Sequence, residues 1–138
     1  SKFMTSNAPA LPIDLRAVGV FWGEAFDLTN VHSDSALFGE QSESGLFPPP
    51  FQYSANRAEA TRVAHEVLTG ERTEFVTDRA DFGEGAGLPA DGDMSIICDG
   101  DGRPVALISD TNVSVRPSPH DPHRQVVVET FEVLFPEQ

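Results

Sequence analysis

The most regular segment of the chain is residues 56–73, NRAEATRVAHEVLTGERT. Asn56 is a favourable N-cap residue, and Glu59 follows three positions later, which is the pattern of a capping box. Four apolar residues recur at helical spacing after this cap: Val63, Ala64, Val67 and Leu68. Gly70 then adopts the left-handed conformation with which many helices end. The segment predicts one amphipathic helix that begins after Asn56 and ends before Gly70.

Downstream of this helix the chain has the pattern of a β-meander. Strands are expected at residues 72–77, 94–98, 104–109, 112–116 and 125–135, which are rich in β-branched and aromatic residues. The turn Asp99-Gly100-Asp101-Gly102 separates the second strand from the third. A helix followed by strands with short connections predicts an α+β fold, in which a small antiparallel β-barrel carries one main helix.

Upstream of the helix the pattern is less regular. Residues 1–55 are expected to form an N-terminal arm, a first strand at the apolar run 18–22, and a long ordered loop or lid at 27–53. Residues 56–135 would form the helix and the barrel core. With 138 residues, the whole chain 1–138 is expected to be a single domain.

The composition limits the classes of partner and compartment. Nine Lys and Arg residues against 22 Asp and Glu give a net charge of −13, which repels the phosphate backbone of long duplex nucleic acid. No apolar run is long enough to span a membrane, and the N-terminal residues lack a secretion signal. Cys98, the single cysteine, is expected to be a buried, inert thiol, so a reducing cytoplasm is expected. The sequence does not distinguish a monomer from a small homo-oligomer.

Together, these segments resemble the ASCH domains of the PUA-like superfamily. The resemblance rests on Val63–Thr73, on the hairpin 91–108, and on the strand segments 110–115 and 126–133. It covers roughly residues 56–135, and it implies an RNA-related or nucleoside-related role. A binding domain for a small nucleoside-like ligand or a short single-stranded RNA is therefore expected, with no cofactor.

Some ASCH relatives resemble hydrolases that deacylate an acetylated cytidine, and the resemblance implies three active residues. These are a Lys shortly after the glycine, a Thr three positions beyond it, and a Glu after the last hairpin. Here the Lys position is Arg72, which does not readily lose a proton, and the Thr position is Phe75. Only a short proline-rich loop between Val115 and Gln125 replaces the segment with the Glu. The chain is therefore expected to be catalytically reduced.

Four residues are the candidate ligand contacts: Arg72, Thr73, Asp110 and Thr111. Arg72 would stack on a base or grip a phosphate, and the others would supply hydrogen bonds. The alternative interpretation of Arg72 is a cation that solvates the end of the helix.

Two other functions stay open, so whether the chain is an enzyme is not determined. The first is a hydrolase of acylated nucleosides or RNA phosphodiesters with substituted catalytic groups; the candidates are Arg72, Glu74 and Glu129, or the loop histidines His120 and His123. A metal site is not expected, because the two histidines lack an evident third ligand. The second is a protein-interaction module that docks through residues 27–53.

Overall fold

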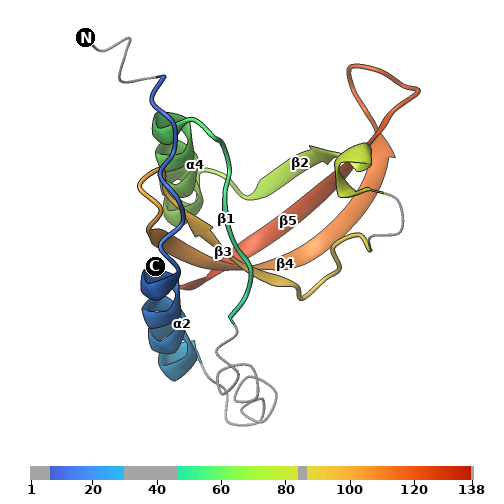
Figure 1. Cartoon of the computed structure of the whole chain (residues 1–138). Coiled ribbons are helices and arrows are strands. Elements are labelled where there is room, and N and C mark those ends of the chain that lie inside the picture. Colours follow the sequence, from blue (N-terminus) through green and yellow to red (C-terminus); the bar gives the residue numbers. More distant parts are fainter. Residues whose placement is uncertain (1–6, 30–46, 84–86, 138) are drawn as a thin grey trace. The chain divides into compact units, whose positions relative to one another are not determined.

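The computed structural model describes residues 7–29, 47–83 and 87–137 (Figure 1). The elements within them are the helices α2 (Leu15–Thr29) and α4 (Arg57–Thr69), a 3₁₀ turn (Arg79–Phe82), and the strands β1 (Pro50–Gln52), β2 (Glu74–Asp78), β3 (Met94–Cys98), β4 (Pro104–Pro117) and β5 (Gln125–Phe135). These five strands form one sheet in the order β1-β3-β4-β5-β2. The α+β fold class predicted from the sequence is confirmed.

The strand pairing differs from a simple meander at both edges of the sheet. β1 lies in the segment that was expected to be a loop, and it pairs in parallel with β3, from Pro50 opposite Ile96 to Gln52 opposite Cys98. At the other edge, β2 is antiparallel to β5, with Phe75 opposite Glu129. The two strands expected at 104–109 and 112–116 are one continuous strand, β4.

α2 replaces the first strand that the sequence predicted at 18–22, and that prediction was wrong. Val18, Trp22 and Ala25 are buried, and their spacing of four and three residues is that of one helix face. In a strand, Val20 would lie on the same face as Val18, yet it is 62% exposed. The helix begins at a cap, because the Ala17 N–H donates to Asp14 Oδ1 at 3.0 Å.

α4 agrees with the caps predicted for it. Asn56 Oδ1 accepts a hydrogen bond from the Glu59 N–H at 2.8 Å, and Gly70 has φ 86°. The buried face carries Ala60, Val63, Ala64 and Val67. Because the capping residues satisfy backbone groups at both ends, this short helix has defined limits.

The described chain forms two compact units, which are described separately. The first contains residues 7–72, 94–108 and 133–137, with their gap at 30–46. Its core places Val18, Trp22 and Ala25 of α2 against Ile96, Cys98 and Leu107. Phe21 meets the ring of Phe135 edge to face, with 5.1 Å between centroids.

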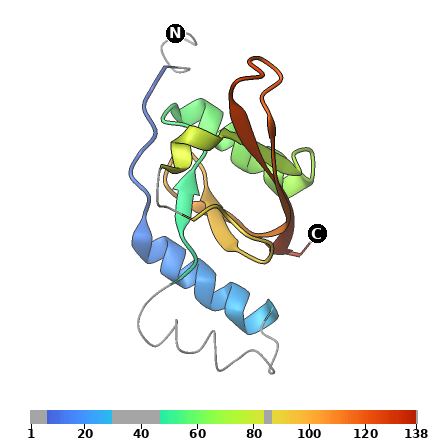
Figure 2. The same cartoon turned by 90° about the vertical axis from the view of Figure 1, so that its right-hand side faces the viewer.

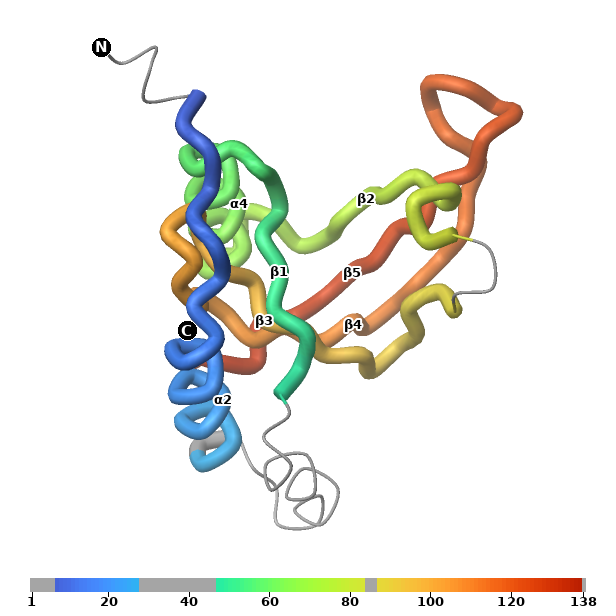
Figure 3. Tube along the Cα trace, viewed as in Figure 1, coloured from blue at the N-terminus to red at the C-terminus, as the bar shows by residue number. Residues whose placement is uncertain are grey.

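An extended arm, residues 7–14, leads into α2 and crosses the β3–β4 turn (Figures 2 and 3). The Leu11 N–H donates to the Gly100 carbonyl and the Asp14 N–H donates to the Gly102 carbonyl, both at 2.8 Å. Gln52 Nε2 donates to the carbonyls of Leu11 and Asp99. The arm is therefore held by backbone groups that lie nearly ninety residues further along the chain.

The second unit contains the described residues within 73–93 and 109–132. Phe75 of β2 stacks on Phe131 of β5, with ring centroids 4.8 Å apart. Asp78 pairs with Arg124 at 2.7 Å. The pKa of Asp78 lies below its usual value, chiefly because its carboxylate accepts the Ala80 N–H, with a further contribution from Arg124.

Candidate functional site

Arg72 lies directly after α4, and its guanidinium is held on that helix. Its Nε donates to Glu66 Oε1 at 3.1 Å, and the same carboxylate binds Arg62 at 2.8 Å. These contacts hold the pKa of Glu66 below its usual value, with the Arg62 hydrogen bond as the largest cause. Arg72 is thus a fixed cation at the end of α4, which agrees with the alternative interpretation of this residue and leaves its flat face for stacking.

That flat face lies over an aromatic ring. The guanidinium carbon of Arg72 is 5.1 Å from the centroid of the Tyr53 ring, and Tyr53 is 43% exposed. A cation at this distance is attracted by the negative face of the ring. We call Tyr53, Arg72 and Glu66 the platform. The sequence pointed to Arg72, but it could not place Tyr53 beside it, because their contact depends on how β1 and α4 pack.

Asp110 is the centre of the candidate residues in the second unit. It is 8% exposed, and it is the one polar or charged residue with a buried side chain among those that the structure describes. Its N–H donates to the Asp93 carbonyl at 2.8 Å, and its carbonyl accepts the Gly92 N–H at 2.7 Å. The backbone of residues 92–93 therefore fixes this point of β4.

The carboxyl group of Asp110 lies beside that of Glu129 of β5. Burial raises the pKa of Asp110 to about 8, and a hydrogen bond to Glu129 together with the charges of Glu129, Asp93 and Asp91 adds to the shift. At neutral pH the buried carboxyl therefore keeps its proton and donates it toward Glu129. The sequence analysis named both residues, in separate roles, and the structure brings them together.

The other candidates in the second unit have backbone roles. Thr111 Oγ1 donates to the Thr130 carbonyl at 3.2 Å, and the Thr73 carbonyl accepts the Phe131 N–H at 3.0 Å. Thr73 and Glu74 have exposed side chains. Of the four expected ligand contacts, Thr73, Asp110 and Thr111 belong to this unit, and Arg72 belongs to the first.

The loop histidines form no metal site in the described part of the chain. His120 and His123 are exposed, and their backbone N–H groups donate to Ser118 Oγ and Asp121 Oδ1, respectively. Among residues 7–29, 47–83 and 87–137, no three His, Cys, Asp or Glu side chains are grouped to hold a metal ion. Residues 30–46 of the segment expected to dock on proteins lie outside the described residues, so that hypothesis stays a prediction.

Cys98 lies in the core of the first unit. Burial raises the pKa of its thiol to about 11, and the charge of Asp99 adds to the shift. The thiol is therefore protonated at neutral pH and is a poor nucleophile, as expected from the apolar run around it.

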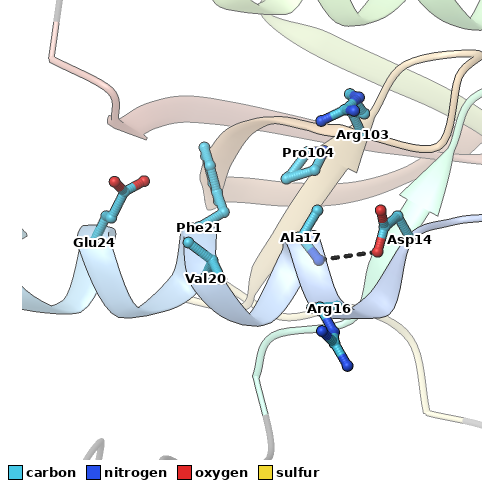
Figure 4. A pocket seen from close by; sticks show the side chains of 8 residues that line it. All are labelled: Asp14, Arg16, Ala17, Val20, Phe21, Glu24, Arg103 and Pro104. Atoms are coloured by element: carbon cyan, nitrogen blue, oxygen red, sulfur yellow. Dashed lines mark hydrogen bonds between the residues drawn. The ribbon is translucent and has the colours of Figure 1, made fainter.

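A pocket of about 420 Å³ lies between one side of α2 and the start of β4 in the first unit (Figure 4). Its lining combines four charged residues with an apolar floor: Asp14, Arg16, Glu24 and Arg103 with Ala17, Val20, Phe21 and Pro104. The sequence analysis missed this face because it predicted a strand here. The signal that identifies it is the helical spacing of Ala17, Val20, Phe21 and Glu24.

Two solved structures are similar to this chain. One is the ASCH domain from Lactobacillus crispatus JV V101, with a TM-score of 0.63 and 16% identity, which covers 88% of this chain and 96% of that one. The other is protein EF3133 from Enterococcus faecalis V583, of the family DUF984, with a TM-score of 0.58 and 19% identity over 75% of this chain and 94% of that one. No protein-family model and no curated protein sequence matches the chain.

Neither α2 nor α4, the α-helices of the described residues, combines the length and apolar character that a membrane-spanning helix requires.

Proposed function

From the ASCH-type fold of this chain, we propose that it is a binding domain for a nucleoside-sized ligand or a short single-stranded RNA. The observation that supports this proposal is the platform, where the guanidinium of Arg72 lies 5.1 Å from the centre of the exposed Tyr53 ring. Planar cations and aromatic rings are the groups on which unpaired bases stack. Glu66 adds a carboxylate acceptor at the edge of the same group.

The surroundings of the platform favour a small ligand. Arg62 contacts both Glu59 and Glu66, and Arg72 contacts Glu66, so the two cations and two carboxylates of this cluster balance, although the chain carries a net charge of −13. A nucleoside or a nucleotide with few phosphates brings little negative charge to the surface. A long duplex brings one charge for every 1.7 Å of axis and is repelled. A ligand with little charge therefore meets a locally balanced cluster, whereas a polyanion is repelled by the net charge of the chain.

Reduced catalysis relative to the amidohydrolase relatives is part of the proposal. Arg72 stands at the position of their Lys, and its guanidinium stays protonated in an ion pair with Glu66. Phe75 stands at the position of their Thr, and its ring is buried against Phe131. Neither residue offers a base or a nucleophilic oxygen, so binding without that deacylation is the function that these side chains support.

A fluorine label tests the platform directly, because Tyr53 is the single tyrosine and Trp22 the single tryptophan of the chain. In protein that carries 3-fluorotyrosine, we expect the one ¹⁹F resonance to shift on titration with cytidine, CMP or a short oligoribonucleotide. Arg72→Ala is expected to weaken binding about tenfold, because a base loses its stacking partner. Arg72→Lys keeps the charge but not the planar group, so it is expected to recover only part of that loss.

The control is a second label in the same unit. Trp22 is buried in the core, so the resonance of fluorotryptophan is expected to stay unchanged during the titration. A Tyr53 signal that does not move at millimolar ligand, or one that moves equally in Arg72→Ala, would contradict the proposal.

Hydrolysis at Asp110 and Glu129 is the second candidate function, and one observation favours it. A buried protonated carboxyl beside a second carboxyl supplies a general acid and a general base from one pair. If the pair is catalytic, Asp110→Asn and Glu129→Gln should each remove turnover of acylated nucleosides or short RNA by a factor of about 100 or more. Purified wild-type protein that is inactive on both substrates, with and without divalent ions, excludes this candidate.

A further inference from the structure

β2 lies at one edge of the sheet, with β5 as its neighbour (Figure 1). No other strand of the described residues pairs with it. An edge strand carries a row of unpaired N–H and carbonyl groups, which can form a ladder with another extended chain. β2 has five residues, Glu74–Asp78, so this row is long enough to receive a short strand from a partner.

The register with β5 identifies the backbone groups of this row. The Phe131 N–H donates to the Thr73 carbonyl, and the positions that bond to the neighbouring strand alternate along an antiparallel pair. Positions 75 and 77 therefore bond to β5, where they lie opposite 129 and 127. At positions 74 and 76 the N–H and the carbonyl point away from β5, and within the described part of the chain nothing bonds to these four groups.

The side chains along this edge set the chemistry of a matching strand. Glu74 and Val76 lie on the same face of the sheet, and both are exposed, Val76 by 54%. Phe75, between them, lies on the opposite face and stacks on Phe131. In a strand added beside β2, one residue lies next to Val76, and the residue two positions away lies next to the Glu74 carboxylate. The edge therefore fits a strand in which apolar and basic side chains share one face.

The charge of the second unit determines the sign of the partner. Its described residues contain nine Asp and Glu against three Arg and no Lys. If two copies of β2 paired antiparallel about Val76, Glu74 of each copy would lie opposite Asp78 of the other, and like charges in this position destabilise a sheet. The net charge of −13 on each copy adds to this repulsion. The edge therefore disfavours a second copy and attracts a basic segment.

We propose that β2 is a docking edge for an extended, basic segment of a partner protein, which adds a strand beside Glu74 and Val76. The outward backbone groups supply hydrogen bonds to any extended chain, whereas the two side chains select basic and apolar residues. This function is separate from that of the platform, because it uses residues of the other unit.

A short synthetic strand tests the proposal on the full chain. The probe is the capped peptide TKTVTKT, whose valine matches Val76 and whose lysines match the charges two positions to either side. We expect a dissociation constant on the order of 1 mM, because a free peptide loses conformational entropy when it is ordered. In ¹H–¹⁵N spectra, the amide protons of Glu74 and Val76 are expected to move downfield, since each gains a hydrogen bond. Those of Phe75 and Thr77 already bond to β5 and are expected to move less.

Three variants separate the backbone ladder, the local charge and the net charge. Val76→Pro removes an outward N–H but no bond to β5, so it is expected to abolish binding. Glu74→Lys is expected to weaken binding of TKTVTKT about tenfold and to make TETVTET the better ligand. Asp101→Lys makes the same change in net charge on an exposed residue of the β3–β4 turn, and it is expected to change the dissociation constant by less than about twofold.

Three results would overturn the proposal. The first is a Val76 amide that does not move with TKTVTKT at about 10 mM, well above the expected dissociation constant. The second is equal binding of TKTVTKT and TETVTET by the wild type, because the edge would then not select basic residues. The third is a Val76 amide that moves with protein concentration alone, which would assign the edge to a second copy of the chain.

Discussion

Gly102→Ala is expected to lower the free energy of unfolding by about 3–5 kcal/mol, the largest single loss expected in the first unit. Gly102 has φ 81°, and an alanine Cβ there would overlap the carbonyl oxygen of Pro12 in the arm. The same residue accepts the Asp14 N–H at 2.8 Å. The arm must therefore move away from the turn, and the hydrogen bonds that hold it are lost with the cap of α2. Urea unfolding followed by the fluorescence of Trp22 measures the loss.

Two other glycines of the first unit separate the two causes of this loss of stability, which are backbone strain and steric overlap. Gly70 has φ 86° and open space around it, so Gly70→Ala reports backbone strain alone, of about 1–2 kcal/mol. Gly100 lacks the positive φ, but an added Cβ would overlap the carbonyl oxygen of Arg57, so Gly100→Ala reports the steric term alone. A Gly102→Ala variant no less stable than Gly70→Ala would show that the arm does not depend on this contact.

Asp110→Asn is expected to stabilise the protein at pH 8 by about 1–3 kcal/mol and to change how stability depends on pH. The pKa of Asp110 is raised to about 8, against about 3.9 in the unfolded chain. Between about pH 4 and about pH 8, the folded state therefore holds a proton on Asp110 that the unfolded chain has already released. The free energy of unfolding falls as the pH rises through this window, by up to about 1.4 kcal/mol per pH unit. The asparagine amide stays neutral and still donates to Glu129.

The measurement is urea unfolding of both proteins at intervals from pH 5 to pH 8. Glu66 and Asp78 have lowered pKa values, so their stabilisation is complete above the pKa of the unfolded chain and adds no slope in this range. Glu132→Gln removes a charge from an exposed position of β5, and it should change stability by less than about 0.5 kcal/mol. Parallel pH profiles for Asp110→Asn and the wild type would rule out the raised pKa of Asp110.

The elements that the sequence predicted well are those with local signals. The caps of α4 at Asn56 and Gly70, and the strand 125–135, follow from residues within a few positions of each other. The prediction of a strand at 18–22 was wrong because valine and aromatic residues favour strands. Two other features favour a helix: Asp14 is a cap residue, and the buried residues Val18, Trp22 and Ala25 are spaced by four and three positions. Here tertiary burial determines the element.

The sequence identified the candidate site residues, but it could not predict which of them lie next to one another. Arg72 was selected from its place after Gly70, yet its neighbour Tyr53 reaches it through the packing of β1, a strand of three residues that begins at the last of three consecutive prolines. Asp110 and Glu129 were selected for different roles, and their proximity depends on how β4 and β5 align. The register between two strands that are distant in the sequence cannot be predicted from a local sequence pattern.

The arm over the β3–β4 turn has a consequence for how the protein is made. Residues 7–14 find their hydrogen-bond acceptors at Gly100 and Gly102, and Phe21 finds its ring contact at Phe135. While the ribosome still holds these later residues, α2 emerges with its apolar side uncovered. A nascent chain of this protein therefore completes its first unit only after Phe135 has left the ribosome, and until then it presents a surface of the kind that chaperones bind.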